Sequence, residues 1–95
     1  MSQPEMVLDC YGSKRWLLNG KLHREGGPAV EQPNGQNFWF LNGKLHREDG
    51  PAVERSGGTK HWYLNGEKVS WEQVFRQAKT PEIELRILTA ALTNA

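Results

Sequence analysis

The chain repeats itself with a period of 23 residues. The segment that starts at Trp16 recurs from Trp39 with 15 of 23 positions identical, and a third copy starts at Trp62 and keeps the register through Gly66. Repetition at a short fixed period is typical of arrays in which one small unit stacks on its neighbours. The repeat therefore predicts a stacked architecture in a single domain, residues 1–95. It also favours an extended binding surface over one catalytic cluster.

Asn-Gly pairs mark the turns of this array. They fall at Asn19-Gly20, Asn42-Gly43 and Asn65-Gly66, each next to apolar residues. Both central residues of a type I′ hairpin turn need positive φ, which asparagine and glycine tolerate well. Further glycine-rich and proline-rich breaks leave only short strands between the turns. We therefore expect an antiparallel β-meander over residues 6–66.

The apolar residues of the second copy are spread over both faces of the expected sheet. Trp39 and Leu41 share one face of the strand, whereas Phe38 and Phe40 share the other. A two-residue turn after Leu41 pairs it with Lys44. Because both faces are half apolar, the sequence leaves open which face is buried.

After Gly66 a helical pattern replaces the repeat. Ser70 and Gln73 have the spacing of a capping box, and apolar residues follow at helical intervals. Thr80-Pro81 supplies an N-cap and a first helical residue for a second helix. We expect residues 70–94 to form a cap of one or two α-helices, which makes the fold class α+β. The alternative is that the wide apolar surface of the second helix forms a homodimer.

Composition excludes several classes of protein. The 12 basic and 11 acidic residues give a net charge of +1, too small to steer the chain to nucleic acids or anionic membranes. The single cysteine, Cys10, cannot form an internal disulfide and suits a reducing compartment. Neither a signal-peptide pattern nor an apolar run of about 18 residues occurs, so we expect a cytoplasmic protein without membrane contact.

The two complete copies each carry a His-Arg-Glu tripeptide, at His23, Arg24 and Glu25 and at His46, Arg47 and Glu48. Arginine suits phosphate or carboxylate, and nearby aromatic residues suit a base, so one interpretation is a site for a nucleotide-like molecule. The other interpretation is a scaffold. In it, Arg24 pairs with Glu48, or Arg47 with Glu25, and histidine packs on tryptophan and bonds a turn carbonyl. Identity between stacked copies favours the scaffold, because stacking alone explains it.

A second candidate surface for binding a ligand or partner varies between the copies. It consists of the aromatic residues on one strand face, Phe38, Phe40, His61 and Tyr63. The three histidines and single cysteine lack the spacing of a metal site, and no nucleophile motif or phosphate-binding loop occurs. We therefore expect no metal, no cofactor and no enzymatic activity.

Residues 12–66 resemble MORN and MORN-like repeats, including YwqK-type relatives, in their period, aromatic strand and hairpin turns. The pattern W-x-L-N-G-x-x-H-R-x-x-G-P-A is similar to a repeat of phage and large-virus proteins, and its most specific part covers residues 23–29 and 46–52. The glycine pairs of true MORN repeats are missing, so lipid binding is not implied.

This resemblance implies a β-hairpin scaffold used for contacts and a phage-encoded protein. Such a protein would inhibit a host or anti-phage defence component by protein–protein contact in the host cytoplasm. The alternative function is sequestration of a nucleotide-like signalling molecule through the His-Arg-Glu steps and the aromatic residues.

Overall fold

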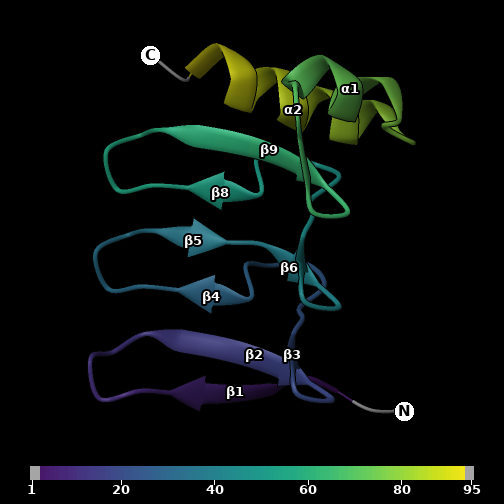
Figure 1. Cartoon of the computed structure of the whole chain (residues 1–95). Helices are drawn as coiled ribbons and strands as arrows, with labels where there is room; N and C mark the ends of the chain where they lie inside the picture. Colours follow the sequence, from purple (N-terminus) through teal and green to yellow (C-terminus); the bar gives the residue numbers. More distant parts are fainter. Residues whose placement is uncertain (1–2, 94–95) are drawn as a thin grey trace.

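Hairpin layers stack on one another, and two helices lie across the last layer (Figure 1). The computed structural model describes residues 3–93. Its strands are β1 (Glu5–Leu8), β2 (Lys14–Leu18), β3 (Lys21–Leu22), β4 (Val30–Glu31), β5 (Asn37–Phe38), β6 (Phe40–Leu41), β7 (Lys44–Leu45), β8 (Val53–Glu54), β9 (Lys60–Leu64) and β10 (Glu67–Val69). Its helices are α1 (Trp71–Arg76) and α2 (Pro81–Thr93). The antiparallel, strand-rich sheet and the C-terminal helices confirm the α+β class.

The strands follow one another through the main sheet in the order β1-β2-β4-β5-β8-β9-β10, with β3 paired to β2. Strands β6 and β7 form a short ladder of their own. Every pairing is antiparallel and joins segments close in sequence. The meander predicted from the turn signals is therefore present.

The Asn-Gly pairs form two-residue turns. Asn19, Asn42 and Asn65 have φ of 52°, 51° and 52°, and the glycine after each also has positive φ. Leu41 pairs with Lys44 across the second turn, as predicted. Asparagine and glycine are needed here because other residues pay a steric cost at positive φ.

Backbone hydrogen bonds join each hairpin to the next copy. The Gly43 N–H donates to the Leu22 carbonyl, and the Gly66 N–H donates to the Leu45 carbonyl, both at 2.8 Å. The Arg24 N–H likewise donates to the Phe40 carbonyl at 3.1 Å. Successive copies are therefore joined by a second series of backbone hydrogen bonds near the Asn-Gly turns, in addition to the strand pairing of the main sheet.

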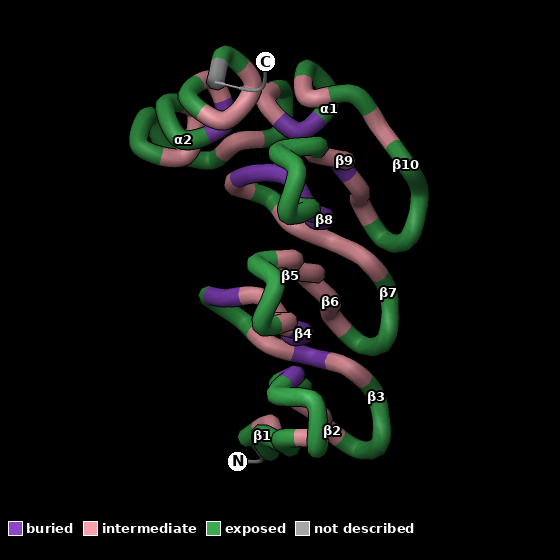
Figure 2. The backbone as a smooth tube through the Cα atoms, turned by 90° about the vertical axis from the view of Figure 1, so that its left-hand side faces the viewer, coloured by how far each residue is buried: buried purple, intermediate pink, exposed green. Residues whose placement is uncertain are grey.

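The fully buried side chains of the two complete copies lie at and just before the short strands β4 and β8. Ala29 and Ala52 are fully buried, and the next residues, Val30 and Val53, are 8% and 4% exposed (Figure 2). Phe38, Trp39, Phe40 and Leu41, the side chains whose face the sequence left open, are all half-buried, so neither set is the more buried one.

The helices close the last copy through a core around Trp62, Val74 and Ile87. The Gln73 Oε1 atom accepts a hydrogen bond from the Ser70 N–H at 3.2 Å, and the Thr80 Oγ1 atom accepts one from the Ile83 N–H at 3.2 Å. The cap predicted for residues 70–94 is thus present, except that residue 94 lies outside the described residues.

Two apolar side chains of α2 lie on its solvent-exposed side, outside the core. Leu85 and Leu92 are 66% and 83% exposed. A homodimer through these helices stays a prediction. In the described part of the chain, neither helix combines the length and the apolar character needed to cross a bilayer.

Candidate functional site

The arginine of the first His-Arg-Glu step lies against the tryptophan that starts its own copy. The Cζ atom of Arg24 is 3.8 Å from the centroid of the Trp16 ring. Its Nη1 atom donates to the Pro28 carbonyl at 3.1 Å and to the Glu31 carboxylate at 3.3 Å. The guanidinium is therefore held by a ring, a carbonyl and a carboxylate of the same copy.

The second copy repeats this arrangement. The Cζ atom of Arg47 is 3.7 Å from the Trp39 ring centroid, and its Nη1 atom donates to the Pro51 carbonyl at 3.0 Å. Nη1 also lies 3.6 Å from Glu54 Oε2, and Nε donates to Asp49 Oδ1 at 2.8 Å. Arg47 is the better neutralised of the two arginines.

The predicted ion pairs between repeats, Arg24 with Glu48 or Arg47 with Glu25, are wrong. Each arginine folds back over its own tryptophan and pairs with the glutamate seven residues later, Glu31 or Glu54. The cation–π contact directs the side chain along its own copy instead of towards the next one.

The glycine of each Gly-Pro pair provides the space for this stacking. A Cβ atom at Gly50 would lie 2.6 Å from the Cζ atom of Arg47, and one at Gly27 would lie 2.9 Å from that of Arg24. Each guanidinium is therefore enclosed between a tryptophan ring and a glycine. The spacing Arg-x-x-Gly is the same in both copies and reflects this contact between the arginine and the glycine. From the sequence alone, the glycine indicates only a turn.

Asp49 links the second copy to the helical cap. Its Oδ1 atom accepts from Arg47 Nε at 2.8 Å, and its Oδ2 atom accepts from Arg86 Nη1 at 3.2 Å. Burial raises the pKa of the Asp49 carboxyl, but the hydrogen bonds and charges of Arg47 and Arg86 outweigh burial, so this pKa lies below its usual value. The first copy has Gly26 at this position and lacks the link.

The histidines join successive copies. His23 Nδ1 accepts a hydrogen bond from the Asn42 N–H, and His46 Nδ1 accepts one from the Asn65 N–H, both at 2.9 Å. The predicted bond to a turn carbonyl is therefore wrong, since the turn provides an amide donor. An accepting Nδ1 assigns the ring hydrogen of the neutral imidazole to Nε2.

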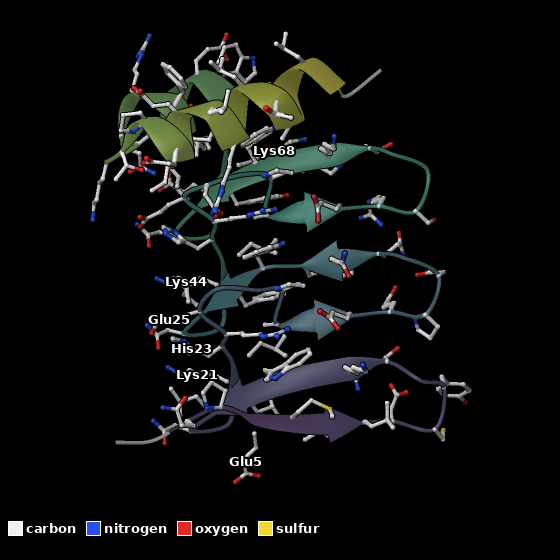
Figure 3. All side chains as sticks on the ribbon, turned by 180° about the vertical axis from the view of Figure 1, so that it is seen from behind. Glu5, Lys21, His23, Glu25, Lys44 and Lys68 are labelled. Atoms are coloured by element: carbon white, nitrogen blue, oxygen red, sulfur yellow. The ribbon has the colours of Figure 1, made fainter. Side chains whose placement is uncertain are left out.

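The glutamates of the two steps lie beside the histidines and stay open to solvent. His46 Nε2 is 3.0 Å from Glu48 Oε2, and His23 Nε2 is 3.8 Å from Glu25 Oε2. The side chains of Glu25 and Glu48 are 85% and 53% exposed. Figure 3 shows His23 and Glu25 at the edge of the stack that also carries Lys21.

Replacing His46 with alanine should lower the free energy of unfolding by about 1–2 kcal/mol, because the Asn65 amide loses its acceptor. His46→Asn places an oxygen near the Nδ1 position and should recover part of this loss. Urea denaturation gives the free energies, and amide hydrogen exchange at Asn65 locates the effect. Unchanged exchange at Asn65 in His46→Ala would contradict the assigned hydrogen bond.

Two pockets of like composition open at successive steps of the array. The first has a volume of about 500 Å³ and is lined by Gln3, Pro4, Trp16, Leu18, His23, Arg24 and Glu25. The second has a volume of about 350 Å³ and is lined by Arg24, Glu25, Gly26, Trp39, Leu41, His46, Arg47, Glu48, Asp49 and Ile83. Five residues of the first pocket recur in the second with the 23-residue spacing, so we call the two together the repeat groove.

In the third copy the helical cap lies where the next pocket of this kind would fall. Val69 and Trp71 hold the positions of His46 and Glu48 in the third copy. Both pack against the core around Trp62. The groove therefore ends at the cap, where Ile83 of α2 lines the second pocket.

The structure brings the two His-Arg-Glu steps together along this groove. It adds Leu18 and Leu41 as lining residues, which sequence reasoning missed although their 23-residue spacing was visible. The varied aromatic residues occupy the strands instead, and all are half-buried: Phe38, Phe40, His61 and Tyr63. Phe38 pairs with both Val30 and Val53 in the main sheet.

Comparison with protein-family models, curated proteins and solved structures finds no match to the chain. Within residues 3–93, no cluster of three or more His, Cys, Asp or Glu side chains is placed to hold a metal ion.

Proposed function

We propose that the chain is a non-enzymatic binding protein that holds an extended segment of a partner protein along the repeat groove. The observation that supports this is the recurrence of the same lining residues in two successive pockets. Repeat scaffolds commonly provide such extended surfaces, and pockets of a few hundred Å³ are typical of binding sites. A segment crossing the groove would place one side chain in each pocket.

The charges of the groove favour cationic side chains in the pockets. Both guanidiniums are already engaged, Arg24 by Glu31 and Arg47 by Glu54 and Asp49. The more exposed charged groups are the carboxylates of the two His-Arg-Glu steps. A lysine or arginine of the partner can lay its apolar stem along a leucine of the groove and bring its charge to these carboxylates.

The same charges argue against sequestration of a nucleotide-like molecule. A phosphate would have to compete with Glu31 for the charge of Arg24, and with Glu54 and Asp49 for the charge of Arg47. It would also approach the exposed carboxylates of Glu25 and Glu48. We therefore favour binding of a partner protein over sequestration of a nucleotide-like molecule. The resemblance to viral repeat proteins supports a host or anti-phage defence component as the partner that is blocked.

A display library of random ten-residue peptides tests this function with the whole chain as bait. Selected peptides should carry lysine or arginine, and their affinity should fall as salt is raised. The double change Glu25→Gln and Glu48→Gln should weaken binding about tenfold, because it removes both exposed carboxylates. The matched control is Glu72→Gln with Glu82→Gln, two exposed carboxylates on the helices.

Binding that survives the groove change but not the control change would contradict the groove as the site. Failure to select any peptide, together with tight binding of a nucleotide, would favour the sequestration alternative. Titration of the chain with nucleoside triphosphates and cyclic dinucleotides supplies that comparison.

A further inference from the structure

Each copy of the repeat advances the stack by two strands. On one side the Trp16 N–H donates to the Ala29 carbonyl, and the Ala29 N–H donates to the Phe38 carbonyl, directly before Trp39 of the next copy. On the side of the Asn-Gly turns, β3 pairs with β2 and is bonded through its Leu22 carbonyl to the next hairpin, β6 and β7. Because paired strands lie about 4.8 Å apart, one copy spans about 9.6 Å along the stack.

The two pockets of the repeat groove are one such step apart. Leu18 of the first pocket recurs as Leu41 of the second, and the place of Gln3 is taken by Gly26. Glu25 lines both pockets, whereas Glu48 lines the second. A partner segment in the groove therefore meets the same kinds of side chain again after about 9.6 Å.

This step selects the conformation of the segment. A polyproline II helix has three residues per turn and rises about 3.1 Å per residue, so its side chains return to the same face after about 9.3 Å. A β-strand returns to the same face after two residues, or about 6.7 Å, and misses the next pocket by about 3 Å. An α-helix needs seven residues and about 10.5 Å, and its turn of about 5.4 Å places a further side chain between the pockets.

We propose that the partner segment binds the repeat groove as a polyproline II helix with lysine or arginine at every third residue. The proposal rests on the function proposed above and adds the conformation and the spacing of the ligand. Two basic residues three positions apart each enter one pocket and bring their charges to Glu25 and Glu48. Trp16 and Trp39, half-buried in the pocket walls, supply the aromatic surface on which polyproline II segments commonly pack.

Two lysines at the same edge of the stack favour spaced basic residues over a continuous basic run (Figure 3). Lys21 and Lys44 are exposed, and their stems run along the Asn-Gly turn of the next copy, where a Cβ atom at Gly43 or Gly66 would lie 3.7 Å from the lysine Cβ. They alternate along the sequence with the two exposed glutamates of the groove. Basic residues at consecutive positions of the segment would bring like charges to these lysines, whereas one basic residue per step matches the glutamates.

Fluorescence anisotropy with the whole chain tests the spacing. The probes are three labelled twelve-residue peptides of equal charge, in which one, two or three prolines separate two arginines within a proline-rich frame. The peptide with two intervening prolines should bind about fivefold more tightly than either of the others, which reach one pocket at a time. Glu48→Gln should remove this preference, because it leaves Glu25 as one carboxylate for two arginines. The matched control, Glu72→Gln at an exposed position of α1, should keep the preference.

Equal affinity for the three spacings would overturn the proposal. If the double change Glu25→Gln and Glu48→Gln then weakens all three peptides, the groove is still the binding site and the proposed function stands. Tighter binding of an alanine-rich helical peptide with arginines seven residues apart would also overturn the proposal, in favour of a bound α-helix. If no arginine peptide binds, the proposed function fails together with this inference. Circular dichroism of the free peptides verifies their conformations.

Discussion

Replacing Trp62 with alanine should lower the free energy of unfolding by about 3–5 kcal/mol, the range for deleting a large aromatic side chain from a core. Trp62 is 8% exposed and packs with Val74 and Ile87, both fully buried. The change removes the side chain on which α1 and α2 rest. Urea denaturation followed by circular dichroism measures the loss.

The control for this change is Tyr11→Ala, which removes an aromatic ring that is 83% exposed and should alter stability by no more than about 0.5 kcal/mol. Hydrogen exchange adds a test of location. In Trp62→Ala the amides of α2 should lose protection, whereas the Asn42 amide, bonded to His23, should keep it. Equal loss at both places would show that the stack unfolds as one unit.

Replacing Gly50 with alanine should lower the free energy of unfolding by about 1–3 kcal/mol, the usual range for an oversized group in a packed site. The new Cβ would lie 2.6 Å from the Cζ atom of Arg47 and would push the guanidinium off the Trp39 ring. The hydrogen bonds from Arg47 to Pro51 and Asp49 would be strained or lost with it. Thermal and urea denaturation measure this effect.

The chain supplies a matched control in Gly57, which also lacks positive φ and has no atom within 4 Å of the methyl group that alanine would add. Gly57→Ala should be neutral or stabilising by up to about 1 kcal/mol, through the unfolded state. In an Arg47→Ala background, Gly50→Ala should cost much less, because the group it displaces is gone. An equal cost in both backgrounds would contradict the enclosed arginine.

The local features of the fold were predictable from particular residues. Asn42-Gly43 allows the positive φ of its turn, so the pairing of Leu41 with Lys44 follows from two residues and their neighbours. Thr80-Pro81 and the apolar spacing after it similarly predict the start of α2. Both signals act over a few residues, which is why the sequence carries them.

The candidate site was only partly predictable. The repetition singles out the His-Arg-Glu steps as candidate site residues. It does not distinguish an arginine–glutamate ion pair within one copy from an ion pair between two copies. Arg24 has glutamates available seven and 24 residues ahead, at Glu31 and Glu48. Only the position of the Trp16 ring in space decides that the side chain turns towards Glu31.

The stacked hairpins, their register and the helices at the end of the chain follow from the order of residues alone, because turn chemistry and periodicity are local. The one correction is that the third hairpin continues past Gly66 as β10 (Glu67–Val69), so helix starts only at Trp71. What the repeated residues contact depends on the folded molecule. Folding encloses Arg47 between Trp39 and Gly50 and joins His46 to the next turn. These contacts depend on how one copy is placed on another, and that placement arises from packing and backbone pairing over the whole stack.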